Sequence, residues 1–323
     1  MKKIVLVFIL ILIVLAAVLG IDFYRKVFLP YKGYTDTITV EIEKGASVST
    51  IGEVLYRKKI IPSYSYFIIY YRLFFSKTNL QSGEFEFTDP MNMRQIIEKL
   101  HKGKVVLYKI TIKEGMTINE TAEFLENNHG ISSTQFLEAA RDLEGYLYPD
   151  TYLIPRGTGA VEMIELMVKK FKDHFTNSLK WRARDINMSV REVVILASLI
   201  EKETAVRDER FLISSVFHNR LRIGMPLACD PTIIYILKKQ NRYDGNIRWK
   251  DLKMASPYNT RIHKGLPPGP ICSPGFASIE AALFPENTKY LYFVSKDGRH
   301  HYFSKTLKEH NWAVRKYIIN RND

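Results

Sequence analysis

Residues 189–204 have the sequence SVREVVILASLIEKET, which predicts a long buried helix that ends in acidic residues. Ser189 followed three positions later by Glu192 is a capping box, in which each side chain satisfies a backbone N–H group of the first turn. The run Val193–Ile200 is apolar or small throughout, so the helix is expected to be buried on nearly every side. Glu203 falls on the same helical stripe three residues past this run, where a buried helix would meet a cleft.

A carboxyl group that is half-buried among apolar side chains has a raised pKa, because burial penalises the charged form. A glutamate in such surroundings keeps its proton near neutral pH and can serve as a general acid. The ordinary alternative is that Glu203 is solvated, or paired with Lys202 or Arg207. The pattern alone therefore marks Glu203 as a candidate catalytic acid.

Downstream of this helix, a second helix is predicted from Asp208 to Arg222, followed by Gly224. Asp230 precedes a proline, which predicts an extended backbone and a helix or turn after it, so a helix cap competes with a catalytic role. Residues 256–275 are rich in proline and predict an irregular wall of the kind that lines a groove.

The C-terminal part predicts a hairpin and a closing helix. A strand is expected at 290–294, a turn at 297–298 and a returning strand at 301–303, and the closing helix is expected to follow His310-Asn311.

Upstream, one pattern occurs twice, about 70 residues apart. Residues 38–42 alternate, a glycine turn follows, and a helix capped by Ser47 comes next; the same order recurs around 110–125, with Thr117 as the cap. These two strand–turn–helix units are expected to pair into a small sheet with helices on one face. Further predicted elements are helices at 64–75, 92–102 and 160–176, a strand at 84–88 and an ordered loop at 145–157.

The chain starts with Met1-Lys2-Lys3 and is then uncharged and apolar from Ile4 to Ile21, about 27 Å as a helix at ~1.5 Å per residue. The two lysines predict that the N-terminus stays in the cytoplasm and the rest is exported. A cleaved signal peptide is the alternative, but the apolar run is longer than the usual ~7–15 residues. We therefore expect a single-pass protein of the cytoplasmic (inner) membrane with its catalytic domain on the periplasmic or extracytoplasmic side.

The net charge of +13 is spread along the chain. For an exported protein it favours anionic lipid headgroups and acidic wall polymers as partners, and not nucleic acid. The two cysteines, Cys229 and Cys272, exclude a disulfide-stapled fold and leave one bridge or two buried thiols open. No zinc, nucleophile-elbow or phosphate-loop motif is present, so no metal or cofactor is expected.

The predicted fold class is α+β: a transmembrane anchor, a small LysM-like α+β domain and a mixed α/β catalytic domain. The boundaries, in order, are 1–24 for the anchor, 25–36 for a stalk, 37–105 for the LysM-like domain, 106–185 for the second strand–helix unit and connecting region, and 186–323 for the catalytic domain. The 37–105 region resembles the LysM fold, a glycan-binding module, although a spacer is an equally good interpretation.

Five motifs together resemble the endolytic murein transglycosylase family (MltG, YceG-like). They are, in order, LASLIEKET at 196–204, VFHNRL at 216–221, DPT at 230–232, YNT at 258–260 and GLPPG at 265–269. The resemblance in order and spacing extends from about residue 144 to the C-terminus. The resemblance implies a lyase that cleaves peptidoglycan strands internally between N-acetylmuramic acid and N-acetylglucosamine. It leaves 1,6-anhydro ends and terminates strands as they grow.

The resemblance also implies residue roles and partners. Glu203 matches the catalytic glutamate, and the expected substrate-binding residues are Asp230, Tyr258, Asn259, Thr260, Asn219 and His301. The implied partners are glycan strands, the cytoplasmic membrane and peptidoglycan synthases (penicillin-binding proteins). Two alternatives stay open: a hydrolytic muramidase using Glu203 and Asp230, and a non-enzymatic membrane-anchored glycan-binding factor.

Overall fold

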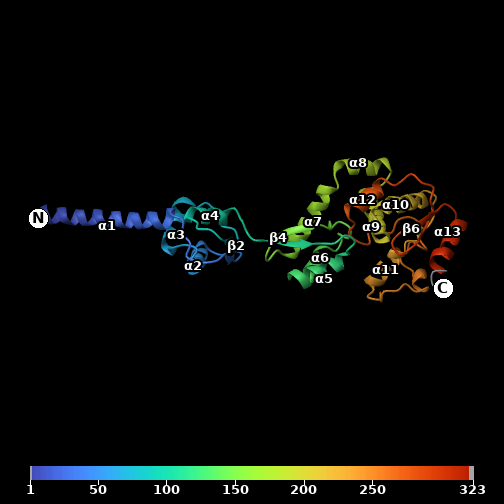
Figure 1. Cartoon of the computed structure of the whole chain (residues 1–323), viewed down its shortest axis with the longest axis horizontal. Helices are drawn as coiled ribbons and strands as arrows, with labels where there is room; N and C mark the ends of the chain where they lie inside the picture. Colours follow the sequence, from blue (N-terminus) through green and yellow to red (C-terminus); the bar gives the residue numbers. More distant parts are fainter. Residues whose placement is uncertain (1, 320–323) are drawn as a thin grey trace. The chain divides into compact units, whose positions relative to one another are not determined.

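The computed structural model describes residues 2–319, which divide into two compact units. Of these, unit 1 comprises residues 2–110 and 153–157, and unit 2 comprises residues 111–152 and 158–319. Both contain helices and short strands (Figure 1), which confirms the α+β fold class. Within the described residues the strands form three two-stranded sheets, β1–β2, β3–β4 and β5–β6.

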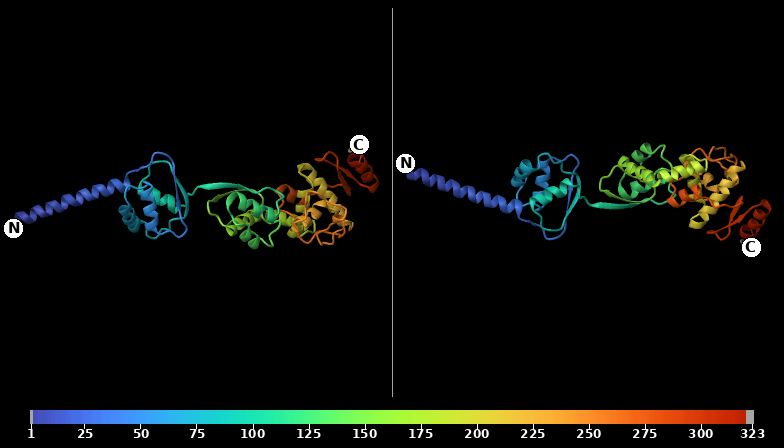
Figure 2. Two further views of the ribbon diagram at one scale, coloured as in Figure 1. Left: turned by 90° about the horizontal axis from the view of Figure 1, so that it is seen from below. Right: turned by 90° about the horizontal axis from the view of Figure 1, so that it is seen from above.

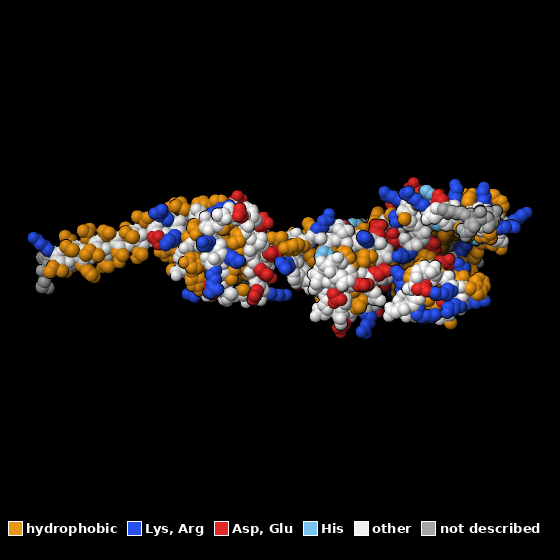
Figure 3. Space-filling view, turned by 60° about the horizontal axis from the view of Figure 1, so that its bottom comes forward, with side chains coloured by type: hydrophobic (Ala, Val, Ile, Leu, Met, Phe, Trp, Pro, Cys, Tyr) orange, Lys and Arg blue, Asp and Glu red, His pale blue; other side chains and the backbone are white. Residues whose placement is uncertain are grey.

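Helix α1 (Lys2–Phe28) is long and apolar enough to cross a membrane, and no other helix of the described residues is. The most apolar 18 residues within Lys3–Phe28 have a mean hydropathy of 3.6, and apolar side chains cover the visible face of the helix in Figure 3. It leaves unit 1 as one continuous helix in both views of Figure 2. A single candidate membrane span is therefore present at the predicted place.

The end of α1 is part of the folded unit. Val27 in its last turn is fully buried in the core of unit 1. Farther on, Tyr31 N–H donates to Met91 O at 3.0 Å and Gly33 N–H donates to Lys59 O at 3.2 Å. Residues 25–36, predicted as a stalk, are thus partly helical and tied to the unit by backbone hydrogen bonds.

Unit 1 is built on an antiparallel strand pair covered by helices. Its elements after α1 are β1 (Ile38–Ile42), α2 (Val48–Arg57), α3 (Tyr64–Phe74), β2 (Gly83–Phe87) and α4 (Met93–His101). In the ladder Val40 faces Phe85, and both side chains are buried together with Leu55 and Phe67 from the helices. The alternation of buried and exposed residues in each strand buries one face of the sheet against these helices.

The internal repeat extends further than the sequence indicates. The same order of elements recurs as β3 (Leu107–Thr111), α5 (Ile118–His129), α6 (Ser133–Ala139), β4 (Thr151–Pro155) and α7 (Ala160–His174). Ser47 and Thr117 cap α2 and α5, as predicted.

The prediction that the two repeats pair with each other was wrong, because β1 pairs with β2 and β3 pairs with β4. Each repeat supplies its own second strand. The strand β4 lies inside the segment predicted as an ordered loop, where Tyr152 and Ile154 alternate with exposed residues and are buried.

The rest of unit 2 surrounds one buried helix. The remaining elements are α8 (Asn177–Asp185), α9 (Val190–Glu203), α10 (Arg207–Arg222), α11 (Asp230–Lys239), η1 (Asp251–Lys253), α12 (Phe276–Leu283), β5 (Tyr292–Ser295), β6 (His301–Ser304), α13 (Leu307–Val314) and η2 (Arg315–Ile319). All residues of α9 from Val193 to Ile200 are buried, and α8, α10, α11 and α12 pack around it. The predicted capping box of Ser189 and Glu192 is present.

The helix α13 begins at Leu307, so the expectation that it follows Asn311 was wrong; the capping box of Thr306 and Glu309 starts it earlier. The proline-rich segment 256–275 contains no helix or strand, as predicted, and both cysteines are buried free thiols.

Candidate active site

Glu203 is the last residue of α9, and its side chain is partly exposed where the buried helix ends. Burial raises the pKa of the Glu203 carboxyl to about 7. A hydrogen bond from the Cys229 thiol and the positive charges of Arg220 and Arg261 act in the opposite direction, while the charge of Asp230 adds to the rise. The residue is therefore poised between its acid and carboxylate forms near neutral pH.

Two arginines supply the positive charge near Glu203, and both are fixed by other contacts. The Arg220 guanidinium donates to Leu291 O at 2.7 Å and to Leu227 O at 2.6 Å. The Arg261 Nε donates to Asp230 Oδ1 at 2.6 Å. Because these contacts hold the cations in place, their field at Glu203 is preorganised.

Asp230, a predicted site residue, begins α11, and its carboxylate forms an ion pair with Arg261. It therefore lies in the electrostatic environment of Glu203 as one half of a charge pair. The residue before it, Cys229, is 1% exposed, and burial raises the pKa of its thiol well above the usual range. The thiol is thus a neutral hydrogen-bond donor toward Glu203.

Thr260 helps to hold the segment around Cys229 in place. Its hydroxyl accepts a hydrogen bond from Cys229 N–H at 3.0 Å and lies 3.1 Å from the Thr232 hydroxyl. Asn259 is fully buried, with its amide donating to Leu252 O and Met254 O and its carbonyl accepting from Arg261 N–H. In this structure both predicted binding residues position the segment that carries Arg261.

Asn219 is also buried and engaged with the backbone. Its amide donates to Thr288 O at 3.0 Å and to Tyr290 O at 2.9 Å, which holds the segment leading into β5 against α10. His301 begins β6, and its Nδ1 lies 2.7 Å from Glu209 Oε2. None of these contacts involves Glu203.

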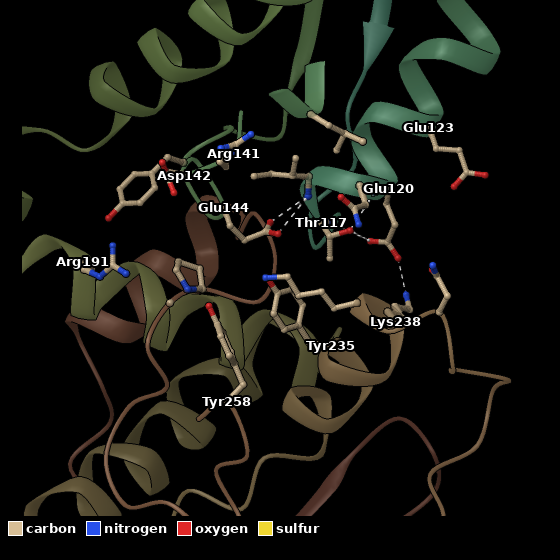
Figure 4. Close-up of a pocket in the computed structure, with 18 residues that line it drawn as sticks. Thr117, Glu120, Glu123, Arg141, Asp142, Glu144, Arg191, Tyr235, Lys238 and Tyr258 are labelled. Atoms are coloured by element: carbon tan, nitrogen blue, oxygen red, sulfur yellow. Dashed lines mark hydrogen bonds and ion pairs between the residues drawn. The ribbon is translucent and has the colours of Figure 1, made fainter. Parts of the chain in front are cut away.

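Tyr258 lies elsewhere in unit 2, in a cavity of about 620 Å³ (Figure 4). Its ring centroid is 5.1 Å from that of Tyr235 on α11. Glu144 lines the same cavity, accepts from Ile118 N–H at 3.1 Å, and has its pKa raised to about 7 by burial. The structure therefore brings Glu203 and Asp230 together, with Thr260 behind them, and places Tyr258 in a second recess.

Arg220 and Arg261 are not among the residues predicted from the sequence, and Cys229 was predicted only as one of two thiols. Signals for them existed: Arg220 lies inside the VFHNRL motif, Cys229 precedes the DPT motif and Arg261 follows the YNT motif directly. No group of three or more His, Cys, Asp or Glu side chains in residues 2–319 could hold a metal ion.

The fold and the site define the class: an α+β protein with an apolar N-terminal helix and a buried-helix glutamate flanked by fixed cations. The model of the YceG-like family matches residues 40–316, and the chain belongs to that family.

Two kinds of relatives illustrate the match. The chain is 34% identical to the endolytic murein transglycosylase of Bacillus subtilis (strain 168), over 89% of this chain and 86% of the relative. It is 27% identical to the endolytic murein transglycosylase of Streptococcus pneumoniae serotype 2, over 87% of this chain and 58% of the relative. A 2.6 Å crystal structure of a YceG-like protein from Listeria monocytogenes is similar, with a TM-score of 0.59, 36% identity, and coverage of 86% of this chain and 98% of the other.

Proposed function

We propose that this protein is a peptidoglycan lytic transglycosylase that cleaves the bond between N-acetylmuramic acid and N-acetylglucosamine inside nascent glycan strands. Its products carry 1,6-anhydro-muramyl ends, and the cut terminates strand elongation. The observation that carries the proposal is the raised pKa of Glu203 in a chain whose relatives are named endolytic murein transglycosylases. A carboxyl of this kind is suited to general acid catalysis.

In the proposed reaction Glu203 acts twice. Protonated Glu203 donates its proton to the glycosidic oxygen, the bond from that oxygen to the muramyl C1 breaks, and C1 gains oxocarbenium character. The resulting carboxylate then takes the proton of the muramyl C6 hydroxyl, whose oxygen attacks C1 and closes the 1,6-anhydro ring. The proton that left Glu203 is replaced, and no water is consumed.

The surroundings of Glu203 suit both halves of this cycle. Burial favours the protonated acid that starts the reaction. The Cys229 thiol and the charges of Arg220 and Arg261 favour the carboxylate that follows proton donation. We propose that these opposed effects keep the two forms close in free energy, so that one side chain serves as acid and then as base.

A hydrolytic muramidase would need Asp230 as a second catalytic carboxylate. Asp230 is instead held by Arg261, and we propose that it tunes the charge near Glu203 as a positioning residue. We propose supporting roles for Asn259, Thr260 and Asn219, and leave substrate contact to His301 and Tyr258, whose side chains are only partly buried.

Replacing Asp230 with Asn tests this assignment. We expect kcat/KM at neutral pH to fall by less than about tenfold, because Glu203 remains, and the alkaline limb of the pH profile to move to lower pH. The shift has this sign because loss of the Asp230 charge removes one cause of the raised Glu203 pKa. Loss of activity as complete as in Glu203→Gln, with no shift of the profile, would favour the two-carboxylate scheme.

The N-terminal part is proposed to be an anchor. With Lys2 and Lys3 on the cytoplasmic side, α1 would span the inner membrane once and place both folded units outside it. The strand–helix–helix–strand order of residues 38–87 supports the proposal that the 37–105 region is LysM-like and contacts glycan. Glycan strands and peptidoglycan synthases are the proposed partners, and 186–323 is the proposed catalytic domain.

The decisive experiment weighs the product ends. The detergent-solubilised chain is incubated with uncrosslinked glycan strands, and the new ends are analysed by mass spectrometry. A transglycosylase gives muramyl ends lighter by one water than the reducing ends that a hydrolase leaves. Reducing ends would refute the proposed reaction, and intact strands would favour a non-enzymatic binding factor.

A further inference from the structure

The cavity that contains Tyr258 is a built recess of unit 2 that takes no part in the proton transfers of the proposed reaction. Its volume is about 620 Å³, and Glu203 is not among the described residues that line it. The helix α11 connects the two places: its first residue, Asp230, belongs to the surroundings of Glu203, and its last turns carry Tyr235 and Lys239 into the cavity. A helix of this length spans about 15 Å, so one bound strand could reach both.

The walls of the cavity carry opposite charges. On the wall formed by residues 117–144, Figure 4 shows the carboxyl groups of Glu120, Glu123, Asp142 and Glu144 together with the guanidinium of Arg141. This wall therefore carries more acidic than basic side chains. The facing wall, formed by residues 191–270, contributes the cations Arg191, Lys238 and Lys239 and, among the described residues, no acidic side chain. One ion pair, Lys238 to Glu120, joins the walls at 2.5 Å.

Several of these charges are available to a ligand. Lys239 is exposed, and its ammonium lies over the rings of Tyr235 and Tyr258, 5.6 and 5.9 Å from their centroids. Its charge acts to lower the pKa of Glu144, but within residues 2–319 it forms no hydrogen bond or ion pair. The exposed side chains of Glu123 and Asp142 form none either. The cavity therefore offers an unpaired cation beside an aromatic face, and unpaired carboxylates opposite.

We propose that this cavity binds a short peptide that carries both a free carboxylate and a free amino group. The carboxylate lies against Lys239, the amino group lies toward Glu123, and the apolar parts pack on the rings of Tyr235 and Tyr258. A neutral sugar ring would use the tyrosines but would leave the opposed charges unmatched.

The inference deepens the proposed function and rests on it, because the muramyl sugars of peptidoglycan carry short peptides of this chemistry. The cavity then recognises the peptide arm of the strand that Glu203 cleaves. Strands with intact peptides would be bound in preference to strands stripped of them.

The test measures binding in the absence of turnover. The full chain with Glu203→Gln, in detergent, is titrated calorimetrically with a muramyl disaccharide–tetrapeptide that has a free side-chain amine, and with the same disaccharide without peptide. Adding Lys239→Glu or Glu123→Lys should weaken binding of the peptide-bearing probe about tenfold each, the scale of one charge-assisted contact. The peptide-free probe should bind all variants alike.

Lys169→Glu is the matched control. Lys169 is an exposed lysine of α7 that does not line the cavity, and its charge reversal should leave the affinity unchanged. Equal affinities for Lys239→Glu and the control would overturn the inference, as would equal affinity of the starting protein for both probes. Circular dichroism confirms that each variant is folded. A wild-type chain that bound the peptide but cut no strand would instead refute the proposed reaction alone.

Discussion

The variant Glu203→Gln is expected to lower kcat on glycan strands by roughly 10³-fold, because an amide can neither donate nor accept the proton that the reaction moves. KM should change little, since the amide has the same size and shape. The measurement is the rate of release of anhydro-muramyl ends from strands of defined length, at saturating substrate and pH 6.5.

Glu192→Gln is the control for this experiment, because it makes the same chemical change at the other end of α9. Glutamine also serves in a capping box, so Glu192→Gln should keep its activity.

The pH dependence of stability gives a second test of Glu203. Because the folded-state pKa of Glu203 is about 7 against an ordinary value of 4.5, the folded state holds a proton that the unfolded state loses between these pH values. Wild-type stability should therefore fall as pH rises through that range, and Glu203→Gln should lack this part of the decline. If Glu203→Gln cut strands at the wild-type rate, the mechanism would be refuted.

Replacing Glu201 with Ala is expected to destabilise unit 2 by about 3 kcal/mol. The side chain of Glu201 is 6% exposed and accepts from Arg210 Nη2 at 3.0 Å and from Gly275 N–H at 3.0 Å. Its removal leaves the buried guanidinium of Arg210 with Glu114, 3.8 Å away, as its one ion-pair partner among residues 2–319. The loss would also loosen the last turn of α9, which holds Glu203.

Denaturation followed by tryptophan fluorescence measures this loss, because Trp181, Trp249 and Trp312 all lie in unit 2. Glu114→Ala is the control: that side chain is 49% exposed, so its ion pair is screened by water and its loss should cost less than about 1 kcal/mol. Equal effects of the two substitutions would show that the pair of Glu201 and Arg210 does not brace the helix.

Local signals in the sequence were sufficient to predict most elements. The capping box at Ser189 and the apolar run after it predicted α9 to within a residue, because both depend on contacts between near neighbours in the chain. The same reasoning located Glu203 at the end of the buried helix. The start of α13 carries an equivalent signal, Thr306 with Glu309, and was missed only because the sequence pattern around it is weakly periodic.

Pairing between distant segments could not be predicted in the same way. The strand β4 has only five residues, lies between two glycines and contains a proline, so its partner in β3 is apparent only from the folded chain. The surroundings of Glu203 show the same limit. Arg220 and Arg261 lie 17 and 58 positions after Glu203 in the chain. Their closeness to the Glu203 carboxyl in the folded protein cannot be read from the sequence.

The supporting roles of the buried polar residues were hidden for a related reason. An asparagine or threonine in a motif can either bind substrate or form hydrogen bonds that hold the protein backbone in place. The burial of the side chain distinguishes these two roles. Asn259 is 0% exposed and Thr260 is 1% exposed, so their side chains form hydrogen bonds with partners inside the protein.

The central claim is that the Glu203 carboxyl keeps its proton near neutral pH. Its titration can be measured directly, by following the protonated-carboxyl C=O stretch in infrared difference spectra of wild type against Glu203→Gln as the pH is raised. Our account predicts a midpoint at about pH 7. A midpoint at or below about 5, the range of a solvated glutamate, would contradict it.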